Sequence, residues 1–254
     1  MSADLAILDR LSTRKSARHR IQPLEALTAL RRLLADPDDT QKALDVTFAL
    51  DGDYSERQIC KLANSREGRR LLAERPPLLD LLSDDAALAA LPEGSFGRAY
   101  RDHLQRYGLD PSKIVELYRG SAPYPDRDAA QTWLVERENL IHDLSHVLSG
   151  YGSDGLGEAA LLAFTIGQQY RPSRLLLTVG ASLEVIRRFG LRWLPYVWRA
   201  WRRGRRAADL VTLPYEELLP LPLDAVRRAV GIDPPEQAHP GGVLELRGEE
   251  MAVR

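Results

Sequence analysis

A short polar cluster near the middle of the chain combines residue types that bind metal ions. It reads His142-Asp143-Leu144-Ser145-His146, and Glu158 follows a glycine-rich stretch. Each residue of an α-helix advances by about 100°, so His142, Asp143 and His146 can face one point. Imidazoles with carboxylates suit zinc, iron, manganese or magnesium. We therefore expect a divalent metal on His142, His146 and Glu158, with Asp143 either ligating it or orienting an imidazole.

The polar face of this segment has a simpler explanation, which is exposure to solvent. Its apolar residues, Trp133 and Leu148 among them, fall on the opposite side, as in an ordinary amphipathic helix. The following segment argues against exposure, because residues 157–166 are apolar nearly all round apart from Glu158. Glu158 could simply complement the helix dipole. A carboxylate in apolar surroundings nevertheless favours a cation partner, and a helical hairpin would bring Glu158 to the histidines.

The hydrophobic periodicity predicts an all-α protein with the metal site between a long helix and the buried helix after it. A single helical domain is expected over residues 22–232, between a weakly ordered N-terminal segment (1–21) and a flexible C-terminal tail (233–254) rich in proline and glycine. The expected helices span residues 24–34, 55–73, 96–107, an element from 111, 126–149, 155–170, 173–189, 191–208 and 223–230.

Composition excludes several classes of protein. With 35 Lys+Arg against 36 Asp+Glu, no global field favours nucleic acid. The hydrophobic content of 44% supports a packed core. Cys60 is the single cysteine, so an internal disulfide is excluded and a reducing compartment is indicated. No apolar run reaches the roughly 20 residues of a membrane span, and no signal peptide is recognisable, so a cytoplasmic protein is expected.

Two other functional interpretations are weaker. Residues 150–155 match the pattern G-x-G-x-x-G, but they follow a helix and not a strand, so we expect a helix C-cap and a tight reversal instead of a dinucleotide site. A phosphohydrolase that uses the His142-Asp143 pair would need another upstream histidine. His103 is the candidate, and its charged neighbours place it on a polar helix face without a role.

The cluster and its surroundings resemble a known family. His142-Asp143-x-x-His146, eleven residues and then Glu158 resembles the signature of the Coq4 family of ubiquinone-biosynthesis proteins. The resemblance covers about residues 24–232 and includes further matching stretches at 92–100, 106–111, 200–204, 215–219 and 223–232.

The resemblance implies a mostly helical fold and a divalent metal held by His142, Asp143, His146 and Glu158. It implies removal of the C1 carboxyl from a polyprenylated 4-hydroxybenzoate-type precursor, with hydroxylation of that carbon. An alternative role in the family is a non-catalytic, prenyl-lipid-binding scaffold that organises other ubiquinone-biosynthesis proteins. The chain departs from eukaryotic members by lacking a mitochondrial presequence, which suggests a bacterial relative. Arg171 and Arg174 depart from the more apolar run expected there.

The segment 191–206 combines Trp193, Trp198 and Trp201 with a dense block of arginines. Aromatic and basic residues together suit a helix at the surface of anionic lipid, which would place the protein at the inner face of the bacterial membrane. The alternative is that the tryptophans belong to the core and the arginines to a solvated face. A homo-oligomer is also expected.

Overall fold

The computed structural model describes residues 21–36, 39–120, 129–247 and 250–253. The all-α class is confirmed, since the strands within these ranges form only a two-stranded antiparallel hairpin. Most of the expected N-terminal segment lies outside the described residues. The elements are α2 (Pro23–Ala35), α3 (Thr40–Leu50), α4 (Tyr54–Ala63), α5 (Arg66–Glu74), α6 (Leu78–Ser83), α7 (Asp85–Ala90), α8 (Phe96–Tyr107), α9 (Pro111–Gly120), α10 (Ala129–Ser149), α11 (Gly155–Gln168), α12 (Pro172–Phe189), α13 (Trp193–Arg206), η1 (Leu210–Thr212), α14 (Tyr215–Leu218), α15 (Leu223–Ala229), α16 (Pro235–Ala238), β1 (Leu244–Arg247) and β2 (Glu250–Val253).

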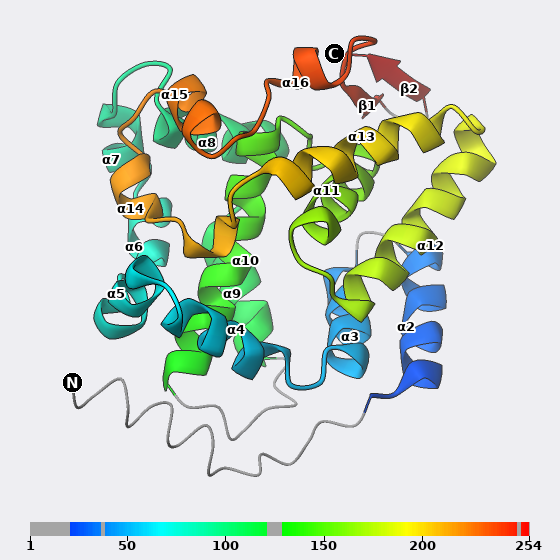
Figure 1. Ribbon diagram of the computed structural model, residues 1–254. Helices are drawn as coiled ribbons and strands as arrows, with labels where there is room; N and C mark the ends of the chain where they lie inside the picture. Colours follow the sequence, from blue (N-terminus) through cyan, green and yellow to red (C-terminus); the bar gives the residue numbers. More distant parts are fainter. Residues whose placement is uncertain (1–20, 37–38, 121–128, 248–249, 254) are drawn as a thin grey trace.

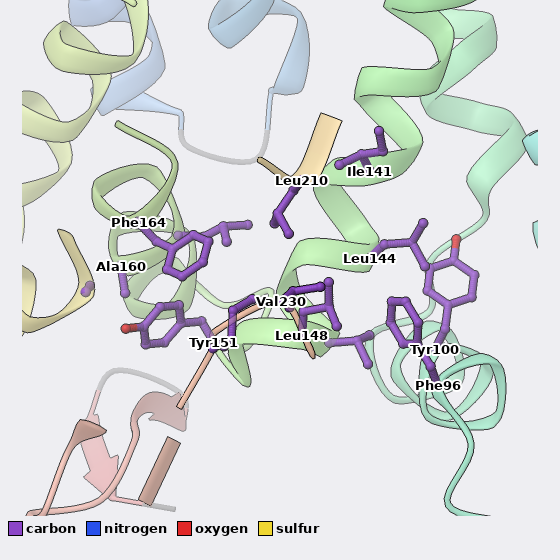
Figure 2. Packing of buried hydrophobic residues seen from close by; sticks show 14 of the residues in the cluster. Phe96, Tyr100, Ile141, Leu144, Leu148, Tyr151, Ala160, Phe164, Leu210 and Val230 are labelled. Carbon is purple, nitrogen blue, oxygen red and sulfur yellow. The ribbon is translucent and has the colours of Figure 1, made fainter. Parts of the chain in front are cut away.

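Helix α10 lies at the centre of the molecule and contacts α4, α6, α8, α9, α11 and α15 (Figure 1). Its apolar side is buried, with Leu144 and Leu148 fully enclosed. Figure 2 shows these leucines in one cluster with Phe96 and Tyr100 of α8 and Phe164 of α11. Burying each such side chain contributes about 1.5–3 kcal/mol, so α10 is held firmly in place.

Helices α11 and α13 approach each other closely because glycines line their crossing. A Cβ on Gly204 would lie 1.8 Å from the carbonyl oxygen of Phe164, and one on Gly167 would lie 2.3 Å from that of Trp201. No larger residue fits without separating the helices. Helix α11 is therefore held between α13, through this close contact, and α10, through the apolar core that they share.

The boundaries differ from the sequence expectation in two places. The expected helix over 55–73 is two helices, α4 and α5, because Ser65 ends one and caps the next by accepting a hydrogen bond from the Gly68 amide (2.8 Å). Helices α3, α6, α7, α14 and α16 were not expected. Apart from α3, these helices are four to six residues long, too short for a clear 3.6-residue period.

The C-terminal residues, expected to form a flexible tail, lie against the helical body. The Arg203 side chain donates hydrogen bonds to the carbonyls of Ser149 (2.9 Å) and Asp233. His239 is 2% exposed, and its Nε2 lies 2.9 Å from the Tyr151 hydroxyl. The tail thus packs beside the end of α10, close to the predicted metal residues.

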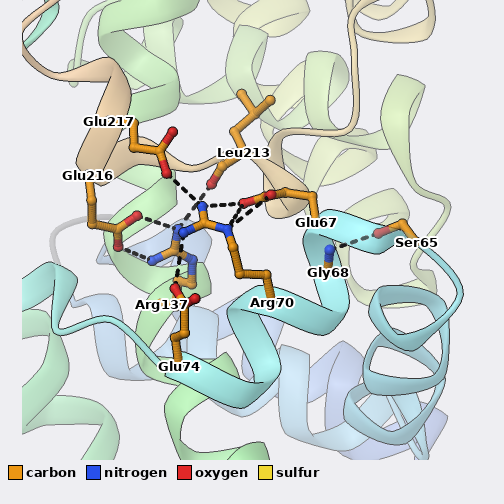
Figure 3. A network of polar contacts seen from close by, with 9 residues as sticks. All are labelled: Ser65, Glu67, Gly68, Arg70, Glu74, Arg137, Leu213, Glu216 and Glu217. Atoms are coloured by element: carbon orange, nitrogen blue, oxygen red, sulfur yellow. Dashed lines mark hydrogen bonds and ion pairs between the residues drawn. The ribbon is translucent and has the colours of Figure 1, made fainter. Parts of the chain in front are cut away.

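A buried ion pair joins α10 to α14. Arg137 is 2% exposed; its guanidinium donates to both carboxylate oxygens of Glu216 (2.5 and 3.1 Å) and to the Leu213 carbonyl (3.0 Å) (Figure 3). Arg70 forms a neighbouring cluster with Glu67, Glu74 and Glu217, in which every side chain is at least one-third exposed.

Replacement of Arg137 by methionine should lower the free energy of unfolding by about 3–5 kcal/mol, because Glu216 is left without its buried partner. Urea denaturation monitored by circular dichroism measures this loss. Arg70→Met is the matched control, since its ion pairs are exposed and should contribute little. Equal effects of the two substitutions would contradict the role of the buried pair.

Candidate metal centre

The hairpin of α10 and α11 brings the predicted ligands together. His142 and His146 are one turn apart on α10, and Glu158 projects from the first turn of α11. Glu158 carboxylate oxygens lie 3.5 Å from His142 Nε2 and 3.1 Å from His146 Nε2. One ligand atom from each of the three residues lies within 4.8 Å of the others. These three side chains form a triad able to share one cation.

The hydrogen bonding of His146 leaves its second ring nitrogen facing the Glu158 carboxylate. Its Nδ1 lies 3.2 Å from the Tyr151 carbonyl oxygen, which can only accept, so Nδ1 carries the hydrogen. In the neutral ring Nε2 then holds a lone pair, buried without a hydrogen-bond partner and facing the Glu158 carboxylate. Two acceptors in contact require a proton or a metal ion between them. A divalent ion fits this donor set.

The electrostatics of the triad also favour positive charge. Partial desolvation lowers the pKa of His142, but Glu158 and Asp143 outweigh this effect and raise that pKa to about 10. Partial desolvation raises the pKa of Glu158, but His146 and His142 outweigh this effect, so its net pKa is well below its usual value. The carboxylate therefore stays ionised and available to a cation.

Asp143 lies behind His142. Its Oδ1 is 3.4 Å from His142 Nδ1, on the side of the ring away from Glu158. Asp143 is not among the residues whose ligand atoms meet within 4.8 Å. The arrangement suits the orienting role, in which a carboxylate fixes the ring of a ligating histidine. Direct ligation by Asp143 stays a prediction.

His103, for which the sequence indicates a polar helix face and no role, lies half-buried against the triad. The ring of His103, from α8, stacks on that of His146 with centroids 5.5 Å apart, and its Nε2 lies 2.9 Å from Ser153 Oγ. Burial, followed by the effect of His146, lowers the pKa of His103 to about 4. His103 is thus a neutral side chain packed against the His146 ring. Its separation along the chain left no sequence signal for this contact.

The loop between α10 and α11 confirms the expected C-cap and reversal. Gly150 has φ +76°, and its amide donates to the His146 carbonyl at 2.8 Å. Asp154 caps α11 by accepting from the amides of Leu156 and Gly157. The same Asp154 oxygen accepts from the Leu246 amide in β1 (3.0 Å). The C-terminal hairpin therefore helps to fix the turn that carries Glu158.

A pocket opens beside the triad. The His142 side chain is 42% exposed and forms part of the pocket wall, so an ion on the triad would be accessible from this side. Leu162, one turn after Glu158 on α11, is half-buried and lines the same pocket. The lining residues are Glu138, Ile141, His142, Ser145, Leu161, Leu162, Thr165, Gln168, Gln169, Arg174, Leu210 and Val211.

The fold and the site define an all-helical protein with a group of two histidines and one carboxylate placed for a metal ion. A family model for coenzyme Q (ubiquinone) biosynthesis protein Coq4 matches residues 27–236. The chain therefore belongs to the Coq4 family, and this membership implicates it in ubiquinone biosynthesis.

Individual relatives agree with this assignment. The chain is 31% identical over 173 residues to the mitochondrial ubiquinone biosynthesis protein COQ4 homolog of Bos taurus, covering 66% of this chain and 62% of the relative. It is 31% identical over 174 residues to mitochondrial COQ4 of Pyricularia oryzae, covering 67% and 55%. The matches thus span less than two thirds of these relatives. A crystal structure of a candidate ubiquinone biosynthesis protein from Nostoc punctiforme shares the fold (TM-score 0.62, 21% identity, 85% of this chain and 100% of that one).

Substitution of Glu158 by glutamine should weaken zinc binding by more than about 100-fold, because the only carboxylate of the triad is lost. Titration of metal-free protein, followed by elemental analysis, measures the change. Glu184→Gln, at a surface ion pair on α12, is the control.

The substitution Asp143→Asn distinguishes the two possible roles of Asp143. If Asp143 only orients His142, zinc affinity should fall by about 10–100-fold; if it is a ligand, zinc affinity should fall as much as in Glu158→Gln. Unchanged zinc affinity in Glu158→Gln would rule out the triad as the metal site.

Proposed function

We propose that the chain catalyses metal-dependent C1 decarboxylation of a polyprenylated 4-hydroxybenzoate-type precursor, in which carbon dioxide leaves and a proton takes its place on the ring. Hydroxylation of that carbon instead would take dioxygen as the oxidant and iron as the metal. The main support is that the triad offers three ligands beside an open pocket. Catalytic zinc sites typically have three protein ligands and keep a further position for substrate or water, whereas structural sites are closed by four. Zinc is the proposed metal, with iron, manganese and magnesium as alternatives.

The pocket is suited to an aromatic ring. Carboxyl loss from an aromatic acid is slow because the electrons left on the ring need stabilisation. A bound divalent ion would supply this stabilisation as a Lewis acid. Leu161, Leu162 and Leu210 offer apolar walls that would enclose the ring and exclude water from it. His142, His146 and Glu158 would hold the ion at one end, and Asp143 would keep the His142 ring in place.

The alternative is a non-catalytic scaffold that binds a prenyl lipid and organises other proteins of quinone biosynthesis. Uncovered apolar side chains favour it: Leu24 is 80% exposed and Leu27 46% exposed on α2. Such residues also suit the expected self-association. In a scaffold, the metal would hold α10 against α11 without contacting the substrate.

Complementation of a quinone-deficient host distinguishes these functions. We expect the wild-type chain to restore quinone, and Glu158→Gln to leave a precursor that retains its ring carboxyl, because the substrate is no longer activated. Mass spectrometry of lipid extracts identifies the intermediate, and Glu184→Gln is the matched control. Full restoration by Glu158→Gln, with the protein at normal abundance, would contradict the enzyme proposal.

We propose that the expected membrane contact involves α12 and α13. Within the described residues no helix combines the length and the apolar character of a membrane span. Leu183 of α12 is 61% exposed, and Trp198 of α13 is 55% exposed. The other exposed apolar residues here are Leu175, Val179, Leu191 and Leu194, and the exposed arginines of α13 and its N-cap are Arg192, Arg199, Arg202, Arg205 and Arg206. This mixture suits the surface of an anionic bilayer. Trp193, at 1% exposed, is a core residue, so its predicted membrane contact is wrong.

A double substitution, Leu183→Ser with Trp198→Ser, should reduce binding to anionic vesicles by about tenfold or more, because two apolar side chains are lost from the contact. Vesicle flotation at low and high salt measures binding. Leu81→Ser is the control, since Leu81 is 40% exposed on α6. Equal flotation of both variants, or no flotation of the wild type, would contradict the proposed contact.

A further inference from the structure

Two arginines near the start of α12 have different surroundings. Arg171 is 8% exposed and fully engaged: its Nε donates to Asp51 at 2.7 Å, and its Nη1 lies 3.6 Å from Glu138. Its guanidinium also lies over the Tyr54 ring at 3.5 Å. Arg171 is therefore part of the framework that joins α12 to α3 and α10.

Arg174 lines the pocket and lacks such partners. No carboxylate in the described part of the chain forms an ion pair with its side chain, and no hydrogen bond to its guanidinium is present there. Glu138, which also lines the pocket, is already engaged by Arg171 and by the Tyr54 hydroxyl (2.9 Å). A guanidinium carries five N–H donors, so the Arg174 group is free to bind an anion. Burial, and then the nearby Arg171 charge, lower its pKa, and the negative charge of an anionic ligand would offset both effects.

The pocket connects Arg174 to the triad. It follows α11 from Leu161 to Gln168, a rise of about 10 Å along the helix. His142 lies in the wall contributed by α10, and Arg174 lies in the wall contributed by α12. Of the lining residues, Arg174 alone carries a fixed positive charge. A ligand in this pocket can therefore meet a metal ion and a guanidinium at once, with leucine side chains around its ring.

We propose that Arg174 recognises the carboxylate of the aromatic acid and orients its ring, so that another ring substituent faces the triad. The identity of the acid rests on the proposed function. The planar guanidinium can hold both carboxylate oxygens, a geometry that lysine does not offer. Arg174 is thus a specificity-determining residue of this chain, at a position where the family resemblance leads one to expect apolar residues.

Binding of soluble probes to the full-length protein tests this assignment. The probes are 4-hydroxybenzoate, its methyl ester and phenyl phosphate, titrated by calorimetry into zinc-loaded protein. We expect the acid to bind about tenfold or more tightly than the ester, and Arg174→Gln to abolish this difference. Arg188→Gln is the matched control, because Arg188 lies on the same helix in a surface pair with Glu184. Arg174→Lys should recover part of the preference, and thermal unfolding checks that each variant folds.

Three results would overturn the assignment: equal binding of acid and ester to the wild type, wild-type affinity for the acid in Arg174→Gln, or no binding of the acid at millimolar concentration. Tighter binding of phenyl phosphate than of the acid would show that Arg174 recognises a phosphate group and not a carboxylate. The same titration in Glu158→Gln separates this inference from the proposed function. An acid preference that persists without metal supports Arg174 recognition even if decarboxylation fails.

Discussion

The lone pair of His146 facing the Glu158 carboxylate is the constraint on which the site depends. The Tyr151 carbonyl holds the hydrogen of His146 on Nδ1, so Nε2 meets the carboxylate as an acceptor. Without a proton or a metal ion between them these two groups repel each other, and burial makes the repulsion stronger. The helices do not relieve it by moving apart, because each is packed against several others. The fold therefore maintains a position for positive charge at the α10–α11 hairpin.

The support for that hairpin does not require the metal. A Cβ on Gly157 would lie 1.9 Å from the Gly152 carbonyl oxygen, so the loop lies directly on the first turn of α11. Asp154 caps this turn and holds the C-terminal strand, while α13 packs on the other side of α11. A structural zinc site usually supplies the folding energy that a small core lacks. Here a large apolar cluster already encloses α10 and α11.

The sequence was most informative where contacts are local. The i, i+4 histidines, the C-cap at Gly150 and the short loop to Glu158 each depend on a few neighbouring residues, and these predictions agree with the structure. The helix boundary at Ser65 was missed although the hydrogen bond that caps the second helix, from the Gly68 amide, is also local. His103 could not be predicted, since only the packing of α8 against α10 brings it to His146.

Arg171 and Arg174, at the start of α12, show how tertiary packing gives two similar residues different surroundings. From sequence they form one departure from the apolar run that the family resemblance predicts. In the structure Arg171 neutralises Asp51 and Glu138, while Arg174, three residues later, lines the pocket. An arginine that only held helices together would keep carboxylates close to its guanidinium, as Arg137 keeps Glu216. The unpaired guanidinium at one end of the pocket and the triad at the other give the two ends different chemistry. On the proposed function, this polarity would orient an asymmetric aromatic acid, which a metal that only joins two helices does not require.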